Sequence, residues 1–328
     1  SSGNRNGNRK EGARATMTNT EVFLQQMIIG LSNGMIIALI ALGYTMVYGI
    51  IELINFAHGD LFMLGCFFAL TILGALGIDS AYDPNSVSWA VLPLFIAVPA
   101  FCAFVNWSVD RLAYRPLRSA PRLAPLVSAI GVSFIFVNLG LFWGGLPMEV
   151  FSNGVAAAAP KDFPALVARD NLLGEASNII VTWNEVLVAM VTIPMMMGLS
   201  LLVKFTRLGK AMRAVAQNQM AARLMGIDVD RVIGSTFLIG GALGGFASIV
   251  YASYNQTIYF QMGFRVGMDA FTAAVLGGIG NLPGAVLGGI VIGIVRAMSD
   301  QYIATEWTNV VVFTILIVVL TFRPSGLL

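Results

Sequence analysis

Charged residues are scarce in this chain. Lys, Arg, Asp and Glu make up 11% of the 328 residues, whereas 57% are hydrophobic and the mean hydropathy is +0.80. A soluble globular domain carries roughly 25% charged residues, so the composition excludes an ordinary soluble fold. The apolar runs reach about 20 residues, the length of a helix that crosses a bilayer. They predict an all-α integral membrane protein rather than a β-barrel, and the net charge of +2 indicates no nucleic-acid partner.

Cysteine and histidine are also rare. Cys66 and Cys102 lie inside apolar runs, so we expect small buried hydrophobic residues and neither a disulfide framework nor a metal site. The single histidine, His58, has Asp60 two residues further on, but residues two apart on a helix do not face each other. No Gly-x-Ser-x-Gly or His-Glu-x-x-His motif accompanies them, so we expect no enzyme activity. The segment GGIGNLPG (277–284) lacks the Gly-Lys-Ser/Thr ending of a phosphate loop, so no cofactor is expected on this chain.

Residues 1–16 are rich in Gly, Asn and Arg and have no apolar periodicity. They are interpreted as a disordered basic tail, or as a segment foreign to the natural chain, with Met17 as the natural start. The rest, 17–328, is expected to form a single transmembrane domain.

The apolar runs predict a polytopic bundle of eight to ten transmembrane segments, some of them broken or re-entrant. Gly-interrupted stretches at comparable places in the two halves indicate a possible inverted repeat. For most glycines, however, close helix packing is the preferred interpretation, since pairs such as Gly30–Gly34 and Gly289–Gly293 have its spacing. The expected spans are 22–40, 41–56, 58–77, 90–109, 123–143, 185–205, 232–254, a hairpin broken at 277–284, and 308–322.

Lys and Arg concentrate in the tail, in 111–122 and in 204–231, and Arg323 follows the last span. Because cytoplasmic loops carry an excess of these residues, we expect all four on the cytoplasmic side, with both termini inside. The Pro- and Ala-rich loop 144–182, where acids outnumber bases, is then periplasmic.

A polar cluster, Asn55, His58 and Asp60, interrupts the long apolar region between residues 22 and 76. Polar groups at membrane depth mark either a translocation pathway or a structural cap at a helix break, and both interpretations stay open here. Arg296 and Asp300 are four residues apart and could pair with each other.

The segment 204–231 is the longest ordered-looking hydrophilic stretch between apolar spans. Helix-forming residues dominate 209–224, and Gly226 is a natural helix stop. An apolar stripe at helical spacing needs cover from the membrane surface, from this protein's own loops or from a partner's groove. That stripe comprises Met212, Val215, Gln219, Ala222 and Met225.

Four long blocks and the ending LTFRPSGLL resemble the LivH-type permease subunits of branched-chain amino-acid ABC importers. The blocks are ALGYTMVYGIIELINFAHGD (41–60), RLAYRPLRSAPRLAPLVSAIG (111–131), RLGKAMRAVAQNQMAARLMGIDVDRVI (207–233) and AFTAAVLGGIGNLPGAVLGGI (270–290). The resemblance extends over nearly the whole chain from Met17, although the loop 144–182 departs most from the family pattern.

The resemblance implies a permease in the bacterial inner membrane with several partners. These are a LivM-type second permease, two cytoplasmic ATPase subunits that bind ATP and Mg²⁺, and a periplasmic substrate-binding protein. A coupling helix would contact the ATPase through Arg213, Ala214, Gln217, Asn218, Ala221, Leu224, Met225 and Gly226. The translocation pathway would be lined or gated near Asn55, His58, Asp60, Gly278, Gly280 and Asn281.

Two alternatives to branched-chain amino-acid import stay open. Related permeases carry urea or short amides, and the sequence does not distinguish these substrates. An ion-coupled secondary transporter would need intramembrane carboxylates, for which only Glu52, Asp60 and Asp269 are candidates.

Overall fold

The computed structural model describes residues 18–51, 55–78, 92–118, 120–121, 123–168, 170–174, 177–323 and 326–327. The predicted tail 1–16 and the candidate carboxylate Glu52 lie outside these ranges. The described residues are almost entirely helical, and eight helices are long and apolar enough to span a membrane. The prediction of a polytopic all-α membrane protein is therefore confirmed.

The long helices follow the apolar runs of the sequence closely. The predicted spans 123–143, 185–205, 232–254 and 308–322 correspond to α4, α5, α8 and α11. The bounds are α1 (Asn19–Ile51), α2 (Ala57–Ala75), α3 (Leu94–Val109), α4 (Leu123–Gly144), α5 (Trp183–Phe205), α6 (Arg207–Gln217), α7 (Gln219–Leu224), α8 (Val229–Asn255), α9 (Met262–Gly277), α10 (Leu282–Tyr302) and α11 (Thr308–Phe322).

Short elements join several of the long helices. A π-helical turn, η2 (Asp110–Tyr114), and a 3₁₀ turn, η3 (Arg115–Leu117), follow α3. The 3₁₀ segments η4 (Glu149–Gly154) and η5 (Thr305–Trp307) lie in other connections, and β1 (Lys161–Asp162) pairs antiparallel with β2 (Thr257–Ile258).

Helix α1 is one continuous helix of 33 residues, so the prediction of two spans broken near residue 40 is wrong. Its glycines are packing positions rather than breaks. A Cβ on Gly34 would lie 2.8 Å from the Cα of Ile290, and one on Gly289 would lie 2.5 Å from the Cα of Ala38. The small residues thus let the backbones of α1 and α10 touch, which confirms the predicted packing role of these glycine pairs.

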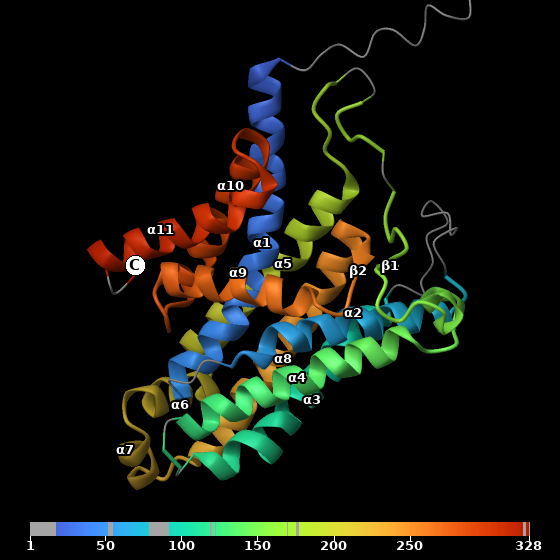
Figure 1. Ribbon diagram of the computed structural model, residues 1–328. Helices are drawn as coiled ribbons and strands as arrows, with labels where there is room; N and C mark the ends of the chain where they lie inside the picture. The colour runs from blue at the N-terminus through green and yellow to red at the C-terminus, as the bar shows by residue number, and fades with distance from the viewer. Residues whose placement is uncertain are drawn as a thin grey trace, which may run out of the picture.

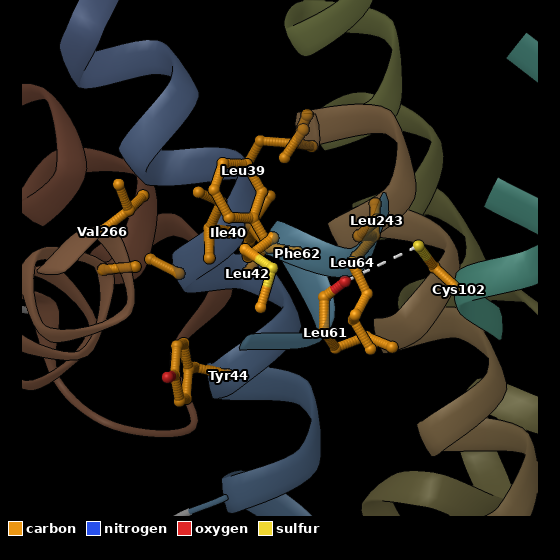
Figure 2. Packing of buried hydrophobic residues seen from close by; sticks show 14 of the residues in the cluster. Leu39, Ile40, Leu42, Tyr44, Leu61, Phe62, Leu64, Cys102, Leu243 and Val266 are labelled. Atoms are coloured by element: carbon orange, nitrogen blue, oxygen red, sulfur yellow. Dashed lines mark hydrogen bonds between the residues drawn. The ribbon is translucent and has the colours of Figure 1, made fainter. Parts of the chain in front are cut away.

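The core lies where α1 meets α2, α8 and α9, and α3 packs on α8 and α2 (Figure 1). Figure 2 shows large aliphatic side chains of α1 and α2 packed against each other, with Cys102 of α3 donating its thiol to the Leu61 carbonyl at an Sγ–O distance of 3.9 Å. Cys66 and Cys102 are both free and buried, which confirms that they act as small core residues. The labelled members of this packing are Leu39, Ile40, Leu42, Tyr44, Leu61, Phe62, Leu64, Cys102, Leu243 and Val266.

The two ends of α1 define opposite ends of the molecule. Near its start, Gln25 hydrogen-bonds Ile180 of the 144–182 loop in both directions, at 2.8 and 3.1 Å. At its other end, the carbonyl of Ile50 accepts from Gln219 of α7 at 3.3 Å. At about 1.5 Å per residue the helix is about 50 Å long. Asn19 and the 204–231 segment therefore lie at opposite ends of the molecule (Figure 1).

This geometry corrects the predicted topology. One candidate span rather than two precedes residue 56, so the start of the described chain lies at the opposite end of α1 from 204–231 and not at the same end as predicted. Helix α10 runs back along α1 to Gln301, which hydrogen-bonds Gln26, and α11 returns so that Leu327 donates to the Leu276 carbonyl at 2.9 Å. The described C-terminal residues therefore lie next to the α9–α10 turn.

The loop 144–182 is held by its own polar contacts. The ammonium group of Lys161 on β1 donates to the carbonyls of Phe151 at 3.0 Å and Ala156 at 2.7 Å. Burial lowers the pKa of Lys161, and only 2% of this residue is exposed. Glu185 completes a capping box with Thr182 at the start of α5. The loop is thereby anchored at the end of the molecule opposite 204–231.

Candidate functional site

The hydrophilic segment 204–231 folds as two helices, α6 and α7, so the prediction of one continuous helix over 209–224 is wrong. Asn218 separates them with extended backbone angles (φ −161°, ψ 107°). Its side-chain oxygen accepts from the backbone N–H of Ala221 at 2.9 Å, which makes it the N-cap of α7. Asn is among the strongest N-cap residues, so the break was readable from the sequence.

The predicted apolar stripe is divided between the protein's interior and its surface. Met212 and Val215 are 2% and 1% exposed where α6 packs against α1, α5 and α8, and Ala222 is 3% exposed on α7, which packs against α8. Gln219 and Met225 are exposed instead. The stripe is therefore covered mainly by this protein's own helices, and the part left open lies at α7.

The open part of α7 is an apolar tip, which we define as Met220, Leu224 and Met225. These three side chains are 68%, 82% and 82% exposed. Of the predicted coupling residues, Ala214 is half-buried, and the others are exposed on the α6–α7 surface. Those exposed residues are Arg213, Gln217, Asn218, Ala221, Leu224, Met225 and Gly226.

The α6–α7 segment is tied to the transmembrane helices by hydrogen bonds. Arg213 donates to the carbonyl of Val203 at the end of α5, and Gln219 donates to the Ile50 carbonyl at the end of α1. Gly226 ends the segment with φ +81°, a left-handed conformation that favours glycine. These bonds join α6 to the end of α5 and α7 to the end of α1.

An ion-pair network beside this segment was not predicted from the sequence. Arg118 donates to Asp110 of η2 and to Asp230 of α8, both at 2.5 Å, and Arg115 donates to Asp230 at 3.1 Å. Arg115 and Arg118 lie more than 100 residues before Asp230 in the sequence, so local spacing could not reveal these ion pairs. The network fastens the 110–118 turns to the first turn of α8.

We expect Arg118→Leu to destabilise the protein strongly. Asp110 has a side chain only 4% exposed, and removing one partner of a buried ion pair costs about 3–5 kcal/mol. The measurement is the thermal unfolding midpoint of the detergent-solubilised chain. Arg231→Leu is the matched control, since Arg231 is 88% exposed in its pair with Asp228, and such pairs contribute about 0–1 kcal/mol. Equal midpoints for the two variants would contradict the structural role of the network.

The polar cluster at 55–60 is enclosed within this single chain. Asn55, His58 and Asp60 are 3%, 1% and 1% exposed. Asn55 accepts from the Tyr114 hydroxyl at 2.7 Å, and Asp60 accepts from the Ser133 hydroxyl at 2.5 Å. The first contact joins Asn55, two residues before α2, to η2, and the second joins α2 to α4.

The His58 ring lies in a slot between α1 and α8. A Cβ on Gly43 would lie 2.4 Å from its Nε2, and the ring meets Tyr44 edge-on with centroids 4.8 Å apart. Among the described residues, neither ring nitrogen of His58 has a hydrogen-bond partner. The glycine is therefore needed for the close approach of this ring.

The second predicted pathway segment forms the turn between α9 and α10. Gly278 and Gly280 have φ of +104° and +90°, and Asn281 caps α10 by accepting from the N–H of Gly284 at 3.3 Å. Gly280 faces Gly49 on α1, whereas His58 faces Gly43. Six residues of helix separate these contacts, about 9 Å along the axis. A role of either segment in the pathway stays a prediction.

No metal site is formed by the described residues, since no three His, Cys, Asp or Glu side chains come together there.

Comparisons with known proteins give one consistent result. Residues 26–320 match the family described as branched-chain amino acid transport system / permease component. The chain is similar to the high-affinity branched-chain amino acid transport system permease protein LivH of Salmonella typhimurium, with 40% identity over 312 residues, covering 93% of this chain and 95% of the relative. BraD of Pseudomonas aeruginosa, described in the same words, is 40% identical over 311 residues with the same coverage.

A more distant relative is the probable branched-chain amino acid transport permease protein LivH of Methanocaldococcus jannaschii. It is 28% identical over 301 residues, which cover 89% of this chain and 88% of the relative. No solved structure matches the chain.

Proposed function

The chain belongs to the family of permease components of branched-chain amino acid transport systems, and we propose that it is the membrane-spanning permease of an ATP-driven importer for these amino acids. The observation that carries the proposal is the match of residues 26–320 to this family, together with eight candidate membrane spans. The chain supplies the path and no hydrolytic chemistry of its own.

Partner subunits supply the energy in this proposal. Two ATPase subunits bind ATP and Mg²⁺ in the cytoplasm, a second, LivM-type permease completes the membrane unit, and a periplasmic protein delivers the substrate. The membrane is the bacterial inner membrane, with 204–231 on the cytoplasmic side and the 144–182 loop on the periplasmic side. Two observations support this orientation: the two segments lie at opposite ends of α1, and Lys and Arg concentrate in 204–231, as in cytoplasmic loops.

The apolar tip of α7 is the proposed ATPase contact. Apolar side chains that are 68–82% exposed fit the helix-in-groove mode of binding, in which an apolar helix face fills a partner's groove. Closure of the ATPase subunits would move α7, and the Gln219–Ile50 hydrogen bond would pass that movement to α1. Since α1 packs on α8, α9 and α10, its displacement would open and close the path.

Reconstitution in vesicles tests the proposal. We expect leucine, isoleucine and valine to enter only when the second permease, the ATPase subunits, the binding protein and ATP are all present. An ion gradient alone should drive no uptake through this chain, and gradient-driven uptake without the ATPase subunits would replace the proposal with a secondary transporter. Uptake and ATPase stimulation by urea but by none of the three amino acids would refute the substrate.

A further inference from the structure

A polar cavity lies between α1, α8, α9 and α10, away from the polar cluster and from the α6–α7 segment. Its volume is about 260 Å³, close to the lower end of the range of roughly 300–1,000 Å³ for small-molecule sites. Four charged side chains line it, and we name it the charged cavity after them. They are Arg265 and Asp269 on α9 and Arg296 and Asp300 on α10.

The charges of the cavity balance. Arg296 donates to Asp269, and their side chains are 12% and 15% exposed. This pair replaces the predicted pairing of Arg296 with Asp300, whose carboxylate instead accepts from the hydroxyl of Thr308. Arg265 and Asp300 are exposed. Two cations and two anions around one space complement a ligand that carries one charge of each sign.

The uncharged lining of the cavity includes a polar part, made of side-chain amides, and an aliphatic part. Side-chain amides come from Gln26 and Asn33 on α1 and from Asn255 at the end of α8. Aliphatic side chains form another part of the wall, and they come mainly from α1: Ile29, Ile36 and Ile37, with Val266 of α9 and Ala297 of α10. A small ligand with a charged head and a branched aliphatic tail matches both parts.

The position of the cavity fits uptake from outside. Of its α1 residues, Gln26, Ile29 and Asn33 lie in the half of the helix that begins beside the 144–182 loop, and Ile36 and Ile37 lie at its middle. Gln26 also hydrogen-bonds Gln301 at the end of α10 at 3.0 Å. The cavity therefore extends from the end of α1 farther from α6–α7 to the middle of that helix. That end is the one that a binding protein on the periplasmic side would reach.

We propose that the charged cavity binds the α-ammonium and α-carboxylate groups of a free aliphatic amino acid, as the first substrate site within the permease. This inference rests on the proposed function for the identity of the substrate. Asp269 and Asp300 receive the ammonium group, Arg265 and Arg296 receive the carboxylate, and the isoleucine-rich wall receives the side chain. Urea has neither charge nor an aliphatic tail, so the cavity discriminates against it.

The test measures binding of radiolabelled leucine to the purified permease complex without the binding protein and without ATP. Arg265→Gln and Asp300→Asn are expected to weaken leucine binding about 10- to 100-fold each, as expected for losing one hydrogen bond to a charged group. Glu306→Gln, an exposed carboxylate outside the cavity, is the matched control and should bind like wild type. Isoamylamine and 4-methylpentanoate, which each lack one of the two charges, should compete at least about tenfold less well than leucine.

A double variant in which Asp269 and Arg296 exchange their charges distinguishes ligand binding from a purely structural role of this ion pair. Asp269→Arg combined with Arg296→Asp keeps an ion pair between α9 and α10, so the folded complex should form, but it reverses the charges that face the ligand. Leucine affinity should fall at least about tenfold. Unchanged affinity in this variant, or in both single variants, would overturn the site. Absence of leucine binding to the wild-type complex would also overturn the site.

Leucine uptake by the complete wild-type system, measured in parallel, distinguishes the two proposals. Uptake combined with unchanged binding in the variants overturns the site and leaves the proposed function standing. Binding that depends on the four charges, without any uptake, overturns the proposed function and leaves the site.

Discussion

Met225→Asp is expected to abolish ATP-driven leucine uptake while the permease still folds and inserts. Met225 is 82% exposed and ends α7, so the carboxylate removes no packing within this chain. Inside an apolar partner groove the same carboxylate would lose its hydration, at a cost of several kcal/mol for an unpaired ion. Because about 1.4 kcal/mol corresponds to tenfold in affinity, a cost of several kcal/mol should weaken docking by at least about a hundredfold. Ala221→Arg, on the same exposed surface, should act in the same way.

The measurements are leucine uptake, leucine-stimulated ATP hydrolysis and the amount of ATPase subunit that co-purifies with the permease. Met225→Leu is the matched control, because it keeps an apolar side chain of similar size and should retain wild-type uptake. Ala222→Arg is a contrasting variant: Ala222 is 3% exposed, so its failure should be one of folding. If Met225→Asp and Ala221→Arg assemble and transport like wild type, the ATPase contacts the permease elsewhere.

Sequence periodicity and charge predicted most of the helical spans but not how α1 is built. Gly30, Asn33 and Gly43 look like interruptions when only local propensity is considered, because glycine weakens an isolated helix. In the folded chain, Gly30 contacts α10 and Gly43 makes room for His58. Glycine can therefore either interrupt a helix or allow two helices to touch, and its tertiary contacts decide between these two roles.

In the candidate site, too, some features can be predicted from the sequence and others depend on tertiary contacts. The residues of 204–231 indicate its hydrophilic and helical character, and Asn218 is an N-cap residue type that marks the break between α6 and α7. Which face of α6 is buried depends on α5 and α8, so spacing alone could not separate buried Met212 from exposed Met225. Arg296 was paired with Asp300 by helical spacing, yet it donates to Asp269, 27 residues away, because the α9–α10 turn brings those helices together.

The family resemblance added what physical reasoning from the residues could not. Composition and periodicity identified a polytopic membrane protein with an exposed helix, and three kinds of cover for that helix stayed open. The long blocks at 41–60, 111–131, 207–233 and 270–290 identified the permease family, and the match of residues 26–320 confirms it. In the structure, Met212, Val215 and Ala222 of the stripe are buried, whereas the apolar tip of α7 is exposed, and this contrast supports the proposal that a partner binds at the tip.

Gly293→Leu is expected to prevent stable folding, the largest effect on stability that we predict. A Cβ at residue 293 would lie 2.3 Å from both the Cα and the N of Gly34, and 2.5 Å from the carbonyl oxygen of Gly30. These are backbone atoms of α1, so no rotation of a neighbouring side chain can relieve the overlap. Overpacking a core typically costs about 1–3 kcal/mol, and separating two helices along their length should exceed that range.

Gly131→Leu provides the matched control on another membrane helix. Gly131 lies within α4, is exposed, and a Cβ there would meet no atom within 4 Å. Both substitutions replace the same helix-weakening residue with the same helix-forming one, so they differ only in what surrounds the new side chain. The unfolding midpoint of the solubilised chain should fall sharply for Gly293→Leu and stay near wild type for Gly131→Leu. Equal midpoints would mean that α1 and α10 do not meet through their glycines, and the cavity between these helices would then lose its wall as well.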